Sequence, residues 1–237
     1  MVTIDVKLLA PDEARDEVLV DGLVRVVNAA YAIGEAGLWL EGTKRTGPGE
    51  IAEAIRGSGI LAATAEDGVV GCAYVRPLEP GMADLGLVSA APERWGSGVG
   101  RELVRSAEVL MRSRGVTTMQ LELLVPKEWV HPEKERLRAW YTRLGYRIVR
   151  PAPFEQVAAH LAPQLATPCE FLIFRKPLAV VTPRGRAAGG RPRTRRRARR
   201  GRWRRRSRRD TRRRSRPSPR RPGPRRASGR RGPPCGG

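Results

Sequence analysis

The chain has 237 residues, with 46 lysines and arginines against 24 aspartates and glutamates. The basic excess is confined to residues 183–237, which hold 25 arginines, no lysine and a single acid, Asp210. The first 182 residues are close to neutral, with 21 basic and 23 acidic residues, and they are long enough for one domain with a hydrophobic core. No apolar stretch reaches 18 residues, so the composition excludes a membrane-spanning helix.

The elements of the first half follow from apolar spacing and turn residues. Strands are predicted over 3–9, 60–64, 69–75 and 82–90. A helix is predicted from Pro11 to Tyr31, because proline and acids suit a first helical turn. A short helix with a mobile loop is predicted over 32–49, followed by a helical turn over 50–56. Asp67 and Gly68 lie between two apolar runs, which predicts a hairpin.

The second half alternates helices and strands. An amphipathic helix is predicted from Val99 until Gly115 ends it, then an alternating strand over 119–125 that Pro126 closes. A helix over 133–144 and strands over 147–149 and 169–176 complete the pattern. Antiparallel strands therefore come first, and a strand–helix–strand–helix–strand unit follows.

A glycine-rich turn joins the strand over 82–90 to the helix that begins near Val99. Gly96, Gly98 and Gly100 allow a ligand to approach the backbone closely, and the helix start offers unpaired N–H groups. Arg94 and Arg101 flank the turn with positive charge. These features predict a site for a pyrophosphate.

Two common phosphate sites were compared with this turn. A P-loop requires Gly-Lys-Ser/Thr at its end, but Gly100 is followed by Arg101 and Glu102, so that site is excluded. A dinucleotide fingerprint matches Gly96 and Gly98, has Arg101 at the third glycine position, and could use Glu122 as its acid. It stays open as the weaker alternative.

The spacing x-x-Gly98-x-Gly100 resembles the acetyl-CoA loop of the GNAT superfamily of N-acetyltransferases. A second segment, from Leu137 to Tyr146, is similar to the family's helix that ends in Tyr-x-x-x-Gly-Phe/Tyr. Trp95 stands where the family usually has Gln or Arg, and Lys134 stands where it usually has Asn. The resemblance implies an α/β fold with a mixed, mostly antiparallel sheet flanked by helices, in which the strands on either side of the first signature helix splay apart.

The resemblance also implies which residues bind acetyl-CoA and which carry out the transfer. The cofactor-binding residues would be Val88, Ser89, Ala90, Arg94, Trp95, Gly96, Ser97, Gly98, Val99, Gly100 and Arg101. Tyr141 matches the tyrosine that protonates the departing thiolate. Glu122 or Asp84 could remove the proton of the amine through water, although an exposed or paired structural carboxylate is the favoured interpretation of each. Glu35 and Glu41 lie where such proteins often build the acceptor pocket, and acids there would suit a cationic amine.

The arginine-rich segment 183–237 has no apolar periodicity, which predicts a disordered tail. Its charge would bind nucleic acid in a salt-dependent way. Alternatively, a GC-rich gene read in a shifted frame would encode this mixture of arginine, glycine, proline and alanine, and the absence of lysine favours this second interpretation.

The leading hypothesis is a cytoplasmic acetyl-CoA-dependent N-acetyltransferase that occupies residues 1–182 and acts on an amine of unidentified structure by direct transfer. We expect neither a signal peptide nor a metal site, because the N-terminus lacks a basic segment followed by an apolar run and Cys72, Cys169 and Cys235 form no C-x-x-C pair. The alternatives are a nucleic-acid-binding protein that acts through its tail and a non-catalytic sensor of acyl-CoA.

Overall fold

The computed structural model describes residues 4–66 and 68–178. The predicted domain boundary at residue 182 and the predicted disordered tail lie outside the described residues. No helix in the described part is long and apolar enough to cross a membrane.

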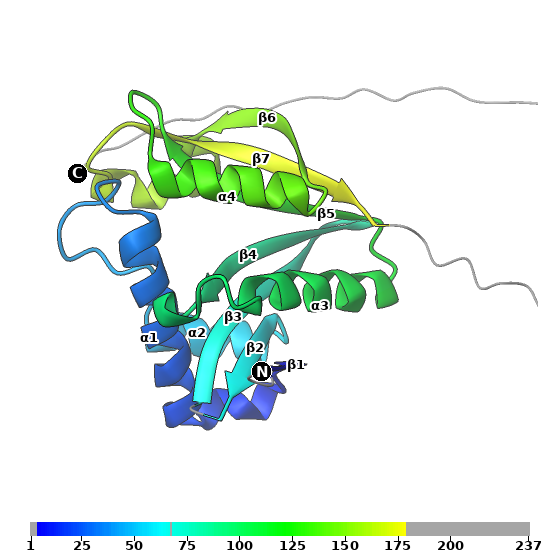
Figure 1. The fold of residues 1–237 in the computed structure, drawn as a ribbon. Coiled ribbons are helices and arrows are strands. Elements are labelled where there is room, and N and C mark those ends of the chain that lie inside the picture. The colour runs from blue at the N-terminus through cyan, green and yellow to red at the C-terminus, as the bar shows by residue number, and fades with distance from the viewer. Residues whose placement is uncertain (1–3, 67, 179–237) are drawn as a thin grey trace, which may run out of the picture. The chain divides into compact units, whose positions relative to one another are not determined.

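One seven-stranded sheet organises this part of the chain, with strand order β1-β2-β3-β4-β5-β7-β6 (Figure 1). Its strands are β1 Asp5–Leu8, β2 Ile60–Ala65, β3 Gly68–Glu79, β4 Met82–Ala90, β5 Thr118–Pro126, β6 Arg147–Pro153 and β7 Cys169–Pro177. All neighbouring strands are antiparallel except β4 and β5, which are parallel. The sheet is therefore mixed and mostly antiparallel, which confirms the predicted fold class.

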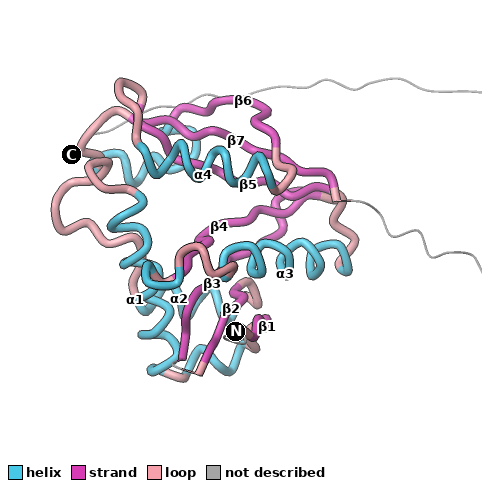
Figure 2. The backbone as a smooth tube through the Cα atoms, viewed as in Figure 1, coloured by secondary structure: helices cyan, strands magenta, loops and turns pink. Residues whose placement is uncertain are grey.

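Strands β4 and β5 separate soon after they meet, as the implied splay requires. They pair only from Met82, opposite Thr118, to Asp84, opposite Gln120. Beyond Asp84 the edge of β4 that faces β5 has no strand partner within the described sheet. Figures 1 and 2 show the two strands converging at one end and diverging at the other.

Helices cover both faces of the sheet. Helices α1 (Glu17–Gly34) and α2 (Pro48–Arg56) pack on one face, and α3 (Val99–Ser113) and α4 (Pro132–Arg143) pack on the other. The alternation of side chains in β2 separates the two cores: Ile60 and Ala62 face α1 and α2, while Leu61 and Ala63 face α3. The short elements η1 (Pro11–Arg15), η2 (Pro92–Arg94), α5 (Phe154–Ala158) and η3 (Ala159–Gln164) complete the described fold.

The predicted start of the first helix, at Pro11, is wrong. Pro11–Arg15 form a separate 3₁₀ turn, and α1 begins at Glu17 because the Asp16 carboxylate accepts a hydrogen bond from the backbone N–H of Leu19, at 3.0 Å. An aspartate in this position satisfies a first-turn donor that has no partner within the helix.

The predicted short helix within residues 32–49 is also wrong. Helix α1 runs to Gly34 and α2 begins at Pro48, and residues 36–47 between them form a loop that contains no helix. The side chain of Asn28 anchors this loop, since its Oδ1 accepts from the N–H of Arg45 at 2.8 Å and its Nδ2 donates to the carbonyl of Thr46 at 2.9 Å. The loop is thereby fixed to α1.

Candidate active site

A cavity of about 930 Å³ lies at the splay between β4 and β5, and the ends of α1, α3 and α4 border it. All eleven predicted cofactor-binding residues line it, from Val88 of β4 through the glycine turn to Arg101 of α3. Glu122 and Tyr141 line the same cavity, whereas Asp84 does not. The structure thus brings together residues from four elements far apart in the sequence.

The glycine turn is shaped to leave open space at the start of α3. Gly98 caps the helix with φ of +100°, and Gly96 has φ of +82°, both in the left-handed region that side chains rarely adopt. A Cβ added at either glycine would meet no atom within 4 Å, so the space above both is free for a ligand. The N–H groups in the first turn of α3 have no partners within the helix and face an anion favourably. This geometry fits a pyrophosphate.

A bulge in β4 shapes the strand at the cavity. Leu87 has φ of +48°, and the register between β3 and β4 shifts between the pairs that Cys72 and Tyr74 make with Ser89 and Gly86. A bulge turns the backbone locally and redirects its N–H and C=O groups. Val88, Ser89 and Ala90, which follow it, lie on the cavity wall.

Trp95 fills a position between the turn and β4. Its indole Nε1 donates a hydrogen bond to the carbonyl of Ala90 at 2.9 Å, and 40% of the residue is exposed. Ala90 lies beyond the part of β4 that pairs with β5. The side chain therefore binds a carbonyl of β4 beyond the segment that pairs with β5.

Tyr141 lies on α4 and is buried among aromatic rings. The ring centroids of Tyr146 and Phe174 are 6.0 and 6.1 Å away, and that of Trp140 is 4.8 Å away. Burial, with a smaller contribution from nearby Tyr31, raises the pKa of the Tyr141 phenol well above its usual range. The phenol is therefore protonated at neutral pH and is a weaker acid than an exposed tyrosine.

Glu122 lies on β5 and is partly buried. Burial raises the pKa of its carboxyl group, and the charge of Asp84 raises it further, against the opposing effects of Arg76 and Arg150. A glutamate with a raised pKa is a stronger base than a free glutamate, which suits proton abstraction.

Asp84 occupies a different environment from that of Glu122, although both carboxylates lie on the same sheet face. Its carboxylate accepts a hydrogen bond from Nε of Arg76 at 3.1 Å, and burial raises its pKa more than Arg76 lowers it. Asp84 is the last residue of β4 that pairs with β5, so the strands have not yet separated there. Its predicted role as a base gains no support from this geometry, and its effect on the cavity is through the pKa of Glu122.

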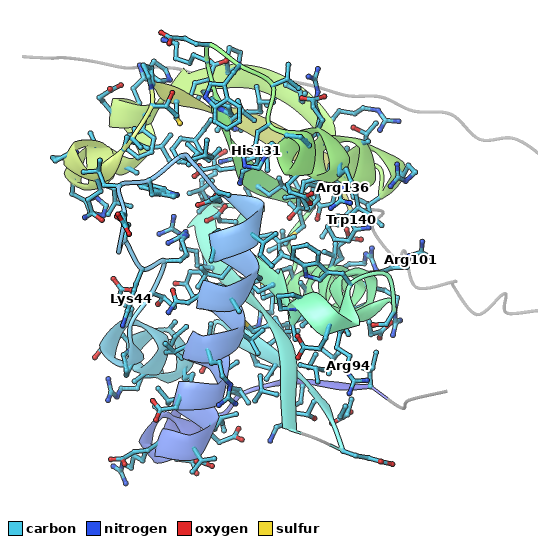
Figure 3. The ribbon with its side chains drawn as sticks, turned by 60° about the vertical axis from the view of Figure 1, so that its left-hand side comes forward. Lys44, Arg94, Arg101, His131, Arg136 and Trp140 are labelled. Carbon is cyan, nitrogen blue, oxygen red and sulfur yellow. The ribbon has the colours of Figure 1, made fainter. Side chains whose placement is uncertain are left out.

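Three residues on one face of α4 also line the cavity, although the sequence analysis did not assign them to the site: Arg136, Trp140 and Arg143. Figure 3 shows Arg136 and Trp140 of α4 on the same side of the molecule as Arg101 of α3. Their i, i+4, i+7 spacing was the available signal, because such residues share a helix face. Arg143 adds a positive charge to the lining beside Arg94 and Arg101, whereas the charge of Arg136 is paired with Glu133, which also lines the cavity.

A second cavity, of about 790 Å³, adjoins the first. It is bordered by α1, the loop over 36–47 and η3, and Tyr31 and Glu35 line both cavities. Glu35 is buried, and its carboxylate accepts from Nζ of Lys134 at 2.7 Å and from the indole Nε1 of Trp39 at 2.6 Å. Glu41, the other acid expected near an acceptor, does not line this cavity. The Lys134–Glu35 pair was not predicted.

Comparisons with known proteins agree with this arrangement. A model of the acetyltransferase (GNAT) family matches residues 34–146. No curated protein sequence matches the chain.

Solved structures share the fold at low sequence identity. One described as an acetyltransferase of the GNAT family, from Desulfovibrio desulfuricans, is 19% identical, with a TM-score of 0.51 over 76% of this chain and 100% of its own. An aminoglycoside 6'-N-acetyltransferase complexed with coenzyme A is 18% identical, with a TM-score of 0.55 over 74% of this chain and 97% of its own. Ard1 from Thermoplasma volcanium is 14% identical, with a TM-score of 0.52 over 74% and 98%. Residues 34–146 therefore match a domain of the GNAT acetyltransferase family, whose members use acetyl-CoA.

Proposed function

We propose that this protein transfers the acetyl group of acetyl-CoA directly to a primary amine. One observation carries the proposal: a single cavity joins an open glycine turn at a helix start to a proton donor, Tyr141, and a base, Glu122. Its volume of about 930 Å³ lies within the range of cofactor sites.

The chain's own groups account for binding of the donor. The first turn of α3 binds the pyrophosphate through backbone N–H groups, and Arg101 adds positive charge beside it. The extended arm of the donor lies along the unpaired edge of β4 at Val88 and Ala90, where backbone groups can hydrogen-bond to its amides. A backbone N–H at this edge polarises the thioester carbonyl.

Glu122 and Tyr141 share the proton transfers. Glu122 accepts a proton from the ammonium group of the acceptor, through water, and the neutral amine attacks the carbonyl carbon. The bond from that carbon to sulfur breaks, and Tyr141 donates its proton to the thiolate that leaves. The acetylated nitrogen loses its second proton to water, so the products are the N-acetylated amine and free CoA, and proton exchange with solvent restores both side chains.

Direct transfer is favoured over a covalent acyl-enzyme because no activated nucleophile borders the cavity in the described part of the chain. Ser89 and Ser97 line it, but their hydroxyls donate to the backbone carbonyls of Leu87 and Arg94. Burial raises the pKa of Cys72 to about 12 and that of Cys169 to about 11, so both thiols stay protonated.

The proposal is tested by CoA release from acetyl-CoA in the presence of a panel of primary amines, together with a thermal shift by acetyl-CoA. We expect both stabilisation and amine-dependent release. Stabilisation without release for any amine would overturn the proposal in favour of an acyl-CoA sensor. The nucleic-acid-binding alternative rests on residues 183–237, and binding of DNA that is lost with those residues would support it.

A further inference from the structure

Hydrogen bonds fix the loop over 36–47, which forms one wall of the second cavity. Besides Asn28, three backbone and side-chain links fix the loop over 36–47: the N–H of Leu40 donates to the carbonyl of Gln164 at 2.8 Å, the N–H of Ala166 donates to Leu38 at 2.9 Å, and Thr46 Oγ1 donates to Glu50 at 2.9 Å. The cavity therefore exists in the protein before any acceptor binds, and its chemistry can be derived from its lining.

Of the two acids that the described residues place in the lining, Glu35 is paired with a cation, and Glu50 accepts hydrogen bonds from neutral groups. Glu35 is buried and bound by the ammonium of Lys134, so its charge is compensated. The Glu50 carboxylate accepts from Thr46 Oγ1 and from the N–H of Gly47 at 3.2 Å, at the first turn of α2. Glu35 is therefore not free to bind a second cation, and Glu50 is the one lining acid whose charge no lysine or arginine of the described residues compensates.

The two cations of the loop in this lining, Lys44 and Arg45, have no carboxylate partner among the described residues. Arg45 lies with its guanidinium carbon 5.0 Å from the centroid of the Tyr31 ring, which holds the side chain beside the residue that borders both cavities. Lys44 lines the same wall and is labelled in Figure 3. Within residues 4–66 and 68–178, neither Lys44 nor Arg45 forms an ion pair with a carboxylate.

We propose that the acceptor is a small amine that also carries a carboxylate, as an amino acid does. The carboxylate binds Arg45 and Lys44, and the amine extends past Tyr31 into the first cavity, toward Glu122. A planar guanidinium suits a carboxylate because it can donate two parallel hydrogen bonds. This inference rests on the proposed function and specifies its acceptor.

The charge of the lining also argues against a polycationic acceptor. Bringing several ammonium groups beside Arg45 and Lys44 places like charges together, and Glu50 is the single lining acid among the described residues left to offset them because Glu35 is paired with Lys134. A cavity of about 790 Å³ that is bordered on three sides suits a small molecule.

The test compares each of the common L-amino acids with its own carboxamide, which has the same amine and no negative charge. Spermidine and kanamycin complete the panel, and acetyl-CoA consumption is followed by CoA release. For the amino acids that react, we expect kcat/KM to exceed that of the carboxamide by about tenfold or more, the size of one charged hydrogen bond.

Variants of Arg45 test whether this residue causes the preference for amino acids over their carboxamides. Arg45→Gln should raise KM for the amino acid about tenfold and bring the ratio of amino-acid to carboxamide kcat/KM close to one, and Arg45→Lys should restore part of the preference. Arg56→Gln is the control, because Arg56 is an exposed arginine on α2 that pairs with Glu53 and lines neither cavity.

The outcomes separate this inference from the function on which it rests. Acetylation of carboxamides, spermidine or kanamycin at rates equal to or above those of the amino acids would overturn the inference and leave the proposed function standing. A preference for amino acids that Arg45→Gln does not change would also overturn the assignment to this wall. Binding of acetyl-CoA with no CoA release for any member of the panel would overturn both.

Discussion

The ammonium of Lys134 and the carboxylate of Glu35 lie 2.7 Å apart in the interior, although 99 positions separate them in the chain. Their side chains are only 4% and 6% exposed. Glu35 follows the last residue of α1 and Lys134 lies in the first turn of α4, so the pair links two helices on opposite faces of the sheet. It sits where the two cavities adjoin, since Glu35 lines both.

Lys134→Met should destabilise the protein by about 3–5 kcal/mol, because it leaves the Glu35 carboxylate buried without a cation. Chemical denaturation of the variant and of wild type measures the difference. The double variant Glu35→Gln/Lys134→Met removes both charges and should recover most of the loss. A double variant as unstable as the sum of the two single variants would show that the charges do not interact.

Gly98→Ala should lower stability by about 1–2 kcal/mol and weaken the thermal shift by acetyl-CoA. Its φ of +100° is unfavourable for a residue with a Cβ, and that Cβ would enter the open space above the glycine turn. Gly49→Ala in α2 is the matched control, because an added Cβ there also meets nothing within 4 Å and its φ is not positive. An unaltered response to acetyl-CoA in Gly98→Ala would contradict the assignment of the turn.

Tyr141→Phe should reduce kcat by about 10²- to 10⁴-fold and leave acetyl-CoA affinity nearly unchanged, because it removes the proton donor and keeps the ring. Steady-state kinetics and a binding titration measure the two quantities. Tyr146→Phe serves as the control: Tyr146 is fully buried, its ring centroid lies 6.0 Å from that of Tyr141, and it does not line the cavity. Full turnover in Tyr141→Phe would return this residue to a packing role.

The pH dependence of kcat/KM should show an acidic limb above the usual range of glutamate, because burial raises the pKa of Glu122 and the base must be ionised to act. Glu122→Gln should remove that limb and lower the rate at neutral pH. A pH–rate profile for both proteins provides the measurement, and an identical limb in the variant would assign it to another group.

The same raised pKa has a consequence for stability, with a sign opposite to that of a salt-bridged acid. The folded state holds the Glu122 proton more tightly than the unfolded state does, so the contribution of this group falls as pH rises from the ordinary glutamate value through the raised one. Glu122→Gln should therefore be at least as stable as wild type at neutral pH, which thermal denaturation measures. A loss of stability in Glu122→Gln would indicate that the Glu122 carboxylate forms a stabilising ion pair and is not destabilised by burial.

A chain that ends at Thr182 should fold and bind acetyl-CoA as the full chain does. The core and both cavities are built from residues up to Leu178, whose N–H donates to the carbonyl of Thr117 at 2.7 Å and whose side chain is buried. Circular dichroism and the acetyl-CoA thermal shift provide the comparison. Unfolding of the shortened chain would place the domain boundary beyond residue 182.

Local patterns predicted most of the elements that build the site. The strand over 82–90 was predicted with both its ends, and the glycine turn and the helix from Val99 were predicted from residues adjacent in the chain. Apolar periodicity, helix starts and turn glycines act over a few residues, which is why a sequence reveals them. The family resemblance then supplied the splay, which the short β4–β5 pairing confirms.

The roles of the charged groups depended on contacts that no local pattern contains. Asp84 and Glu122 are acids on the neighbouring strands β4 and β5. Where these strands separate, Glu122 lies at the cavity, whereas Asp84 lies before that point and is bound by Arg76. Lys134 was noted only as a departure from the family, yet in the folded chain it compensates Glu35, a residue that lines both cavities. Such pairings join residues distant in sequence, and burial decides their strength, so the tertiary structure alone determines what each charge does.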